Sequence, residues 1–262
     1  MKKFLLLLLF TLSSMQAFSS YTGNPLSPAL LQSGLFSGQN YLINVATGYV
    51  YDNVWDKDLT PTENPDFSSL EKVGDFEMRS NFATLALIFF RRLEVYGYFG
   101  VSKENIDWTA KTPFTSPEIA TKNHFSYALG AKAIMLQFSQ TVFSLDFQYF
   151  TLPSSNMMVQ KIVNIYMPFD VNSQYLQVQQ WHFTLGVASK IGPLTPYAGA
   201  TYTRFYLQLP SNSNFPTLKF KGKRNWGLFL GASLNISHLF FVTGEVHFFD
   251  EKSYALSATT SF

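Results

Sequence analysis

The sequence contains no cysteine. This absence excludes disulfide bridges, thiolate metal sites, a cysteine nucleophile and a lipid attached to an N-terminal cysteine. Charged residues are also scarce, at 14% of the chain, whereas soluble domains carry about 25%. Beyond the N-terminal leader, no apolar run approaches the roughly 20 residues that a membrane helix needs. The chain therefore fits neither a disulfide-stapled domain nor a helical membrane protein.

Aromatic residues, in contrast, make up 17% of the chain. A β-barrel membrane protein accounts for both the scarce charge and the many aromatics. Every second residue of its strands faces lipid, and aromatic girdles lie at the two membrane interfaces. The formal net charge of +2 does not suggest a nucleic acid as partner.

The first residues have the features of a secretory signal. Met1-Lys2-Lys3 precedes the apolar run Phe4 to Phe10, which is too short to span a bilayer as a helix. Ala17 and Ser19 form a small-x-small cleavage pattern, which predicts a signal peptide over residues 1–19. Ala17 itself is the alternative end. A signal anchor retained in the membrane is the competing interpretation, and the polar residues that follow the run at once argue against it.

The last ten residues, Ser253 to Phe262, alternate between a large apolar face and a small polar face. A chain terminus normally frays, so an aromatic final residue indicates a strand that is held in place. Terminal strands of outer-membrane barrels resemble this one, and their last aromatic residue is read by the barrel assembly machinery. Phe262 and Tyr254 are therefore the expected assembly signal.

The same alternation predicts about ten strands, whose connections are alternately long and short, as in outer-membrane barrels with short periplasmic turns and long external loops. We expect an all-β fold, a transmembrane antiparallel up-and-down β-barrel of the outer membrane, over residues 41–262. An irregular segment, residues 20–40, precedes it and lies against the wall or partly plugs the barrel. The predicted strands are Tyr41–Tyr51, Phe76–Phe90, Leu93–Ser102, His124–Phe138, Thr141–Leu152, Tyr175–Lys190, Pro196–Leu207, Asn225–Ile236, Leu239–Phe249 and Ser253–Phe262.

Two alternatives to this fold remain open. Met158 to Met167 is rich enough in Val, Ile and Tyr to be a strand, and its pairing within its loop would raise the count to about twelve. A secreted soluble β-sandwich is the second alternative, but it would leave the apolar face of Asn225 to Ile236, which includes Trp226, unexplained. An acidic loop, Asp52 to Asp75, and a basic loop ending in Lys219 to Arg224 could pair over the mouth or face lipopolysaccharide and host surfaces.

Both ends of the chain resemble a known family. Gly23-Asn24-Pro25-Leu26-Ser27-Pro28-Ala29-Leu30-Leu31, followed by Gly34-Leu35-Phe36, is similar to the opening of mature chlamydial major outer membrane proteins. Phe241 to Val246 and Phe249 to Lys252 resemble that family's closing hairpin. The resemblance implies a surface-exposed, oligomeric porin. Family members are larger and cysteine-rich, so this chain cannot share their disulfide cross-links, and its pore would be narrower.

The predicted inner face carries charges of both signs. Barrels of about eight strands are filled by side chains and porins of about 16 to 18 strands are open, so about ten strands lie between these limits. The charges either line a narrow channel for ions and small solutes, which the resemblance favours, or plug the lumen of a structural or adhesin-like surface barrel. Lys190 and Arg204 are two more cationic residues that we expect to point into the lumen. The candidate lumen-lining residues are Glu77, Arg79, Glu94, Lys132, Asp146, His182, Glu245 and His247.

An outer-membrane protease is the less favoured interpretation. Glu245 and His247 share one face, and His182 could share the lumen, but none of these histidines is next to a pair of aspartates. General base catalysis needs an oriented base and a nucleophile within reach, and zinc needs convergent ligands. We therefore expect no enzyme activity, no metal and no cofactor. The expected partners are outer-membrane lipid and lipopolysaccharide, the barrel assembly machinery and, from the resemblance, further copies of the chain.

Overall fold

The structure is a computed structural model, which describes residues 21–30, 42–63, 70–110, 118–162, 165–168, 175–209, 218–237 and 239–261. The predicted signal peptide and Phe262 lie outside these residues. No helix in the described ranges is long and apolar enough to cross a membrane. The elements are α2 (Ser27–Leu30), β1 (Ile43–Asp56), β2 (Leu59–Glu63), β3 (Leu70–Phe89), β4 (Leu93–Ala110), β5 (Glu118–Thr121), β6 (His124–Phe138), β7 (Thr141–Ile162), β8 (Ile165–Pro168), β9 (Tyr175–Ser189), β10 (Leu194–Leu209), β11 (Leu218–Gly222), β12 (Trp226–Asn235), β13 (Phe240–Phe248) and β14 (Lys252–Ser261).

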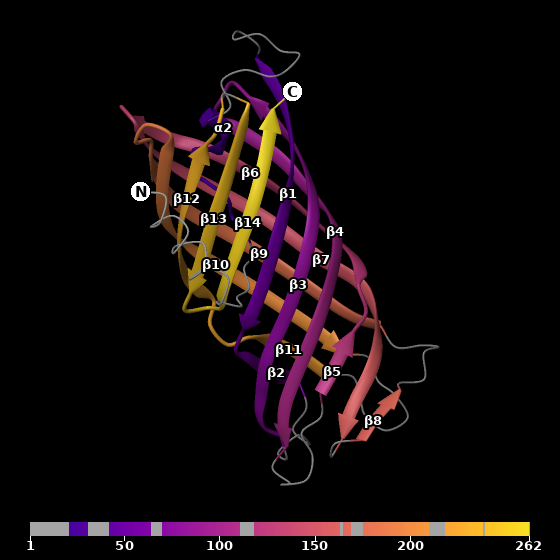
Figure 1. The fold of residues 1–262 in the computed structure, drawn as a ribbon. Helices are drawn as coiled ribbons and strands as arrows, with labels where there is room; N and C mark the ends of the chain where they lie inside the picture. Colours follow the sequence, from indigo (N-terminus) through magenta and orange to yellow (C-terminus); the bar gives the residue numbers. More distant parts are fainter. Residues whose placement is uncertain are drawn as a thin grey trace, which may run out of the picture.

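Ten strands form a closed antiparallel wall, in the order β1, β3, β4, β6, β7, β9, β10, β12, β13 and β14 (Figure 1). The last strand pairs with the first, from Ala46 opposite Ser261 to Asp56 opposite Lys252. Closure gives every wall strand two partners, which removes the exposed edges and satisfies the backbone in lipid. The predicted ten-stranded barrel is confirmed.

The alternative count of twelve is wrong. Residues 158–162 continue β7 beyond the wall, and β8 folds back on them, with Ile162 opposite Ile165. This hairpin adds strands outside the membrane and none that crosses it. β2, β5 and β11 extend the sheet at the same end of the barrel (Figure 1).

The stretch from Asp52 to Asp75 is only partly a loop, contrary to our expectation. β1 continues to Asp56, and Asp52 is buried on its inner face. β2 then pairs with β11, and Lys223 Nζ lies 3.9 Å from Asp58 Oδ2. The acidic and basic segments therefore lie together, because their strands share a ladder.

The two ends of the barrel differ. At the turn end, short hairpins join the wall strands, as at Phe90 and Arg91, whose φ angles are 51° and 56°. β14 also ends here, and α2 lies at the same end of the barrel (Figure 1). At the other end, which we call the loop end, the short extra strands β2, β5, β8 and β11 lie together (Figure 1). Outer-membrane barrels have their short turns in the periplasm, so the loop end faces outward from the cell.

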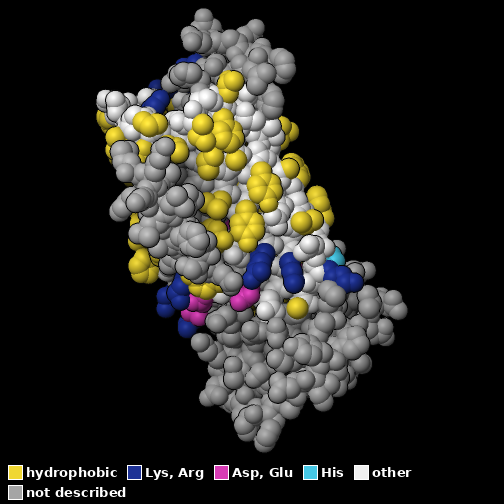
Figure 2. Space-filling view, in the orientation of Figure 1, with side chains coloured by type: hydrophobic (Ala, Val, Ile, Leu, Met, Phe, Trp, Pro, Cys, Tyr) yellow, Lys and Arg dark blue, Asp and Glu magenta, His cyan; other side chains and the backbone are white. Residues whose placement is uncertain are grey.

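The outer face of the wall is apolar, and Figure 2 shows many of these side chains above a row of charged ones. Alternate residues of each strand lie exposed on it, as predicted for Trp226, Leu228 and Leu230 of β12. A soluble protein rarely exposes an apolar surface of this extent, whereas a lipid-facing barrel requires it. The protein is therefore an outer-membrane β-barrel. Other exposed members of this belt are Leu85, Leu87, Val95, Phe99, Leu129, Phe147, Phe183, Leu185 and Leu256.

Candidate functional site

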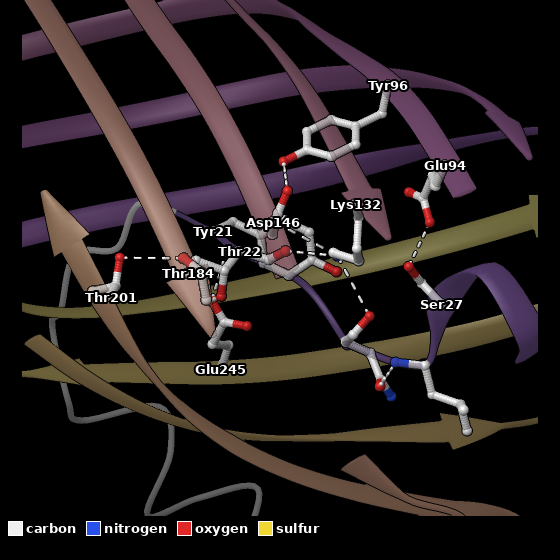
Figure 3. A network of polar contacts seen from close by, with 12 residues as sticks. Tyr21, Thr22, Ser27, Glu94, Tyr96, Lys132, Asp146, Thr184, Thr201 and Glu245 are labelled. Carbon is white, nitrogen blue, oxygen red and sulfur yellow. Dashed lines mark hydrogen bonds and ion pairs between the residues drawn. The ribbon is translucent and has the colours of Figure 1, made fainter. Parts of the chain in front are cut away.

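The N-terminal residues Tyr21 to Leu30, which we call the plug segment, occupy the barrel lumen (Figure 3). Tyr21, Thr22, Asn24 and Leu26 are all buried there. The segment contains Gly and Pro and has no strand periodicity, so it does not join the sheet. Its polar groups instead bind side chains of the inner wall.

Glu245 of β13 is the main acceptor for the plug segment. Its Oε1 accepts hydrogen bonds from the backbone N–H and the hydroxyl of Thr22, each at 2.8 Å. Tyr197 of β10 donates to Oε2 at 2.8 Å, and His247 Nε2 lies 2.7 Å from Oε1. A buried carboxylate is stable only with such partners.

Lys132 of β6 holds the segment from the opposite side. Its ammonium donates to the backbone oxygens of Thr22, at 2.8 Å, and Asn24, at 3.4 Å. Its Nζ also lies 3.9 Å from Asp146 Oδ2 on β7, and Tyr96 of β4 donates to Asp146 Oδ1 at 2.8 Å. Lys132 therefore binds two backbone carbonyls of the plug segment, and side chains from two neighbouring strands support it through Asp146.

Three further side-chain hydrogen bonds fix the segment along its length. The Tyr21 hydroxyl lies 2.7 Å from Ser257 Oγ on β14. Asn24 Nδ2 donates to Ser233 Oγ on β12 at 2.8 Å. The Ser27 hydroxyl donates to Glu94 Oε2 on β4 at 2.5 Å. These bonds reach three different wall strands, so the segment spans the width of the lumen.

Two glycines allow the close approach of segment and wall. Gly23 has a φ of +72°, and a Cβ there would lie 3.1 Å from Lys132 Nζ. A Cβ on Gly186 of β9 would lie 2.5 Å from Pro25 Cγ. Larger residues at either position would push the segment away from the wall.

The lumen is also filled nearer the loop end. The Phe76 and Phe205 rings lie 5.0 Å apart, and Leu207 and Phe220 are buried with them. His182 is buried in this half of the lumen, and its Nδ1 lies 3.2 Å from Thr203 Oγ1. Its Nε2 has no hydrogen-bond partner among the described residues. Wall side chains themselves therefore narrow this half of the barrel.

A buried ion pair lies at the loop end, outside the membrane-spanning strands. Lys57 Nζ lies 2.5 Å from Glu251 Oε2, and both side chains are about 1% exposed. Burial alone would raise the pKa of Glu251, but the adjacent Lys57 ammonium outweighs it and lowers this pKa to about 2. The pair ties the β1–β2 connection to the β13–β14 connection.

The cavities beside the plug segment are small. One of about 30 Å³ is lined by Tyr21, Glu94, Tyr96 and Lys132, and one of about 20 Å³ lies between Tyr21 and Gln148. Each has room for a water molecule or two. A solute larger than water does not fit beside the plug segment at these two places.

The structure places six predicted lumen residues on the inner face. Five of them surround the plug segment, and His182 lies nearer the loop end. The five are Glu94, Lys132, Asp146, Glu245 and His247.

The predicted inward facing of Glu77 and Arg79 is wrong. Their neighbours Phe76, Met78 and Ser80 are buried on the inner face of β3, so both charged residues point outward. β3 continues beyond the lipid belt at the loop end, where outward charges meet water. Arg204 is exposed on the outer face of β10 for the same reason, and Lys190 is half-buried next to a turn.

The residues expected to signal assembly lie at the seam. Tyr254 of β14 faces outward, with its ring 6.0 Å from that of Tyr51 on β1, across the closing strand pair. Phe262 lies outside the described residues, so the assembly role of both residues stays a prediction.

Sequence reasoning missed the plug segment's own contact residues, Tyr21, Thr22, Asn24 and Ser27, and their wall partners Tyr96 and Tyr197. One sequence signal could have pointed to them. The segment is polar and contains Gly and Pro, and the predicted lumen carries charges that need hydrogen-bond partners. In the described residues, no three His, Asp or Glu side chains lie so as to hold a metal ion.

Comparison with known proteins gives the following. No family model and no curated protein matches the chain. Among solved structures, the outer membrane protease OmpT from Escherichia coli is 9% identical over 84% of this chain and 97% of that one, with a TM-score of 0.44. Outer membrane protein AlkL is 10% identical over 93% and 96%, with a TM-score of 0.41. OprG from Pseudomonas aeruginosa is 8% identical over 88% and 97%, with a TM-score of 0.36.

Proposed function

We propose that this outer-membrane barrel is a narrow channel for ions and small solutes that its own plug segment keeps closed. The main support for the proposal is that Glu245 and Lys132 form hydrogen bonds with Thr22 from opposite sides of the lumen. The resemblance to chlamydial major outer membrane proteins points to the same solute class.

The plug segment is suited to leave the lumen because it is not a strand of the wall. Side-chain hydrogen bonds hold much of it, and water can replace such bonds at modest net cost, about 1 kcal/mol for each neutral bond. Its departure would expose charges of both signs, Glu94, Lys132, Asp146 and Glu245, which are suited to a hydrated and weakly selective path.

The path would stay narrow. Phe76, Phe205 and Phe220 belong to the wall and its loop-end extension, and they remain when the plug segment leaves. We therefore expect conductance well below that of open porins with about 16 to 18 strands.

A permanently plugged surface barrel is the second candidate. It is favoured by the extension of β5, β8 and the β2–β11 pair beyond the lipid belt, where they could meet external partners. In that case the buried network serves stability alone.

The geometry favours binding over catalysis for Glu245 and His247. Thr22 and Tyr197 occupy the Glu245 oxygens, and the His247 ring stacks 5.6 Å from Phe229. Among the described residues, Thr22, Tyr197 and Phe229 therefore occupy the space around the two side chains. We expect no peptidase activity, and peptide cleavage that is lost in His247→Ala would contradict this.

Planar bilayer recordings test the proposal. The full chain and a variant without residues 21–30 are refolded, and insertion is confirmed by the heat-dependent gel mobility of folded barrels. We expect the full chain to be closed most of the time and the variant to show small, steady steps. Steady conductance of the full chain would contradict the proposal that the plug segment closes the lumen. No conductance from either inserted protein would contradict the proposed channel and favour the permanently plugged surface barrel.

A further inference from the structure

We propose that Arg79, Lys103 and Lys122 form a binding site for the phosphate groups of lipid headgroups in the outer leaflet. These three residues, the cationic rim site, lie on neighbouring elements β3, β4 and the β5–β6 connection, and all three are exposed. The proposal concerns the outer face of the barrel and is independent of the plug.

Aromatic side chains on the outer face of the wall indicate how the site lies relative to the membrane. Tyr and Trp pairs on the outer face lie toward the loop end, with ring centroids 4.4 Å apart for Tyr149 and Trp181 and 5.1 Å for Tyr202 and Trp226. Such residues mark the headgroup level of a membrane protein. Arg79 lies opposite Asn53, which on its other side pairs with Tyr254. The cationic rim site is thus level with the lipid headgroups.

The strand register makes the cations direct neighbours. Arg79 lies opposite Lys103 in the β3–β4 ladder. Thr121 binds Glu104, and His124 lies opposite Ser102, so Lys122 between them lies beside Lys103. Like charges that face each other across a strand pair destabilise it unless an anion lies between them.

No described carboxylate forms an ion pair with these cations, although Glu77 lies on the same face two residues from Arg79. Arg79, Lys103 and Lys122 make no ion pair and no side-chain hydrogen bond with another described residue. Other cations of the same rim are engaged. Lys252 pairs with Asp56, and Arg224 donates to the backbone oxygen of Phe249.

A lipid phosphate meets these requirements. It carries negative charge at the depth of the site, and Arg binds phosphate through a planar pair of donors while Lys adds a point charge. Figure 2 shows Lys and Arg side chains in a row directly beside the apolar belt, so one lipid can place its chains on the belt and its phosphate on the row.

Lipid retention tests the site. The folded protein is placed in phosphatidylcholine vesicles that contain a minor fraction of a phosphomonoester lipid, extracted with mild detergent, and its bound lipid is measured by native mass spectrometry. We expect enrichment of the phosphomonoester lipid, reduced roughly tenfold in Arg79→Gln/Lys103→Gln, because each cation near an anionic surface contributes to binding. The control Arg91→Gln/Arg92→Gln removes two cations at the turn end and should retain the lipid.

Two further arms complete the test. Arg79→Lys/Lys103→Arg keeps both charges and should keep the enrichment, which separates charge from a folding defect. Inorganic phosphate at equal phosphate concentration should not displace the lipid, and displacement would reveal a free-phosphate site and overturn the proposal. Equal enrichment in the wild-type protein and in Arg79→Gln/Lys103→Gln would overturn it as well.

Discussion

The ammonium of Lys132 lies 2.8 Å from the backbone oxygen of Thr22, a residue 110 positions earlier in the chain. The same ammonium is 3.9 Å from Asp146. One buried cation therefore serves both the wall and the plug segment.

Lys132→Met should release the plug segment. The change removes the donor to Thr22 and leaves the buried Asp146 without its cation, which costs roughly 3 kcal/mol in unfolding free energy. Limited proteolysis of the refolded protein should cut the chain before residue 42, and bilayers should show openings. The control Lys223→Met removes an exposed lysine and should change neither.

Gly23→Ala should loosen the plug segment specifically. Gly23 and Gly192 both have positive φ, so alanine costs roughly 1 kcal/mol of backbone strain at either position. Only at Gly23 would the new Cβ crowd Lys132 and Tyr21, because nothing lies within 4 Å of a Cβ on Gly192. Faster proteolysis of residues 21–30 in Gly23→Ala alone is the expected result; equal proteolysis of both variants would contradict it.

The Lys57–Glu251 pair should stabilise the barrel in a pH-dependent manner. The pKa of Glu251 is lowered from 4.5 to about 2 in the folded chain, so the stabilisation is fully present above about pH 4.5. It is lost as the pH falls through about 2. Glu251→Gln should reduce the free energy of unfolding by a value on the order of 3 kcal/mol near neutral pH.

Urea unfolding in detergent micelles at several pH values measures this difference, which should vanish toward about pH 2. Asp56→Asn serves as the control, because it breaks the exposed pair with Lys252 and should cost less than about 1 kcal/mol. A difference between wild type and Glu251→Gln that persists at the lowest pH would contradict the assigned role of the pair.

Deletion of Phe262 should reduce the yield of inserted barrel much more than it changes the conductance of barrels that do insert. β14 closes the wall against β1, so a strand end that is not recognised leaves both strands without a partner. The folded fraction in outer-membrane extracts gives the measurement. Phe262→Tyr keeps an aromatic end and should assemble normally.

Much of the wall could be predicted from alternation alone. In β12 and β13 the two faces differ clearly, so the sequence predicts Trp226 and Leu230 toward lipid and Glu245 and His247 toward the lumen, as the structure has them. In β3 the alternation correctly predicts a strand, but the charged face near the loop end points outward and not inward. Phe76 and Met78 fill the lumen there, while Arg79 lies exposed on the outer face beyond the apolar belt, because the belt ends before the strand does.

The plug segment could not be predicted in detail because its contacts are not local. Thr22 and Glu245 lie 223 positions apart, and neither strand periodicity nor residue spacing carries information over that distance. The pairing of β2 with β11 could not be predicted for the same reason, because the two strands are far apart in the sequence. Composition suggested that the two segments could meet, but only the closed wall brings their backbones into one ladder.

The sequence separation of Thr22 from its partners also affects when the plug segment can form its bonds during assembly. The plug segment is synthesised and exported first, whereas β13 and β14, which carry Glu245 and Ser257, are exported last. The bonds of the segment to Glu245 and Ser257 can therefore form only after almost the whole chain has been exported. If the segment docks only after the wall has closed, refolding that is quenched early should yield closed barrels in which protease still cuts residues 21–30.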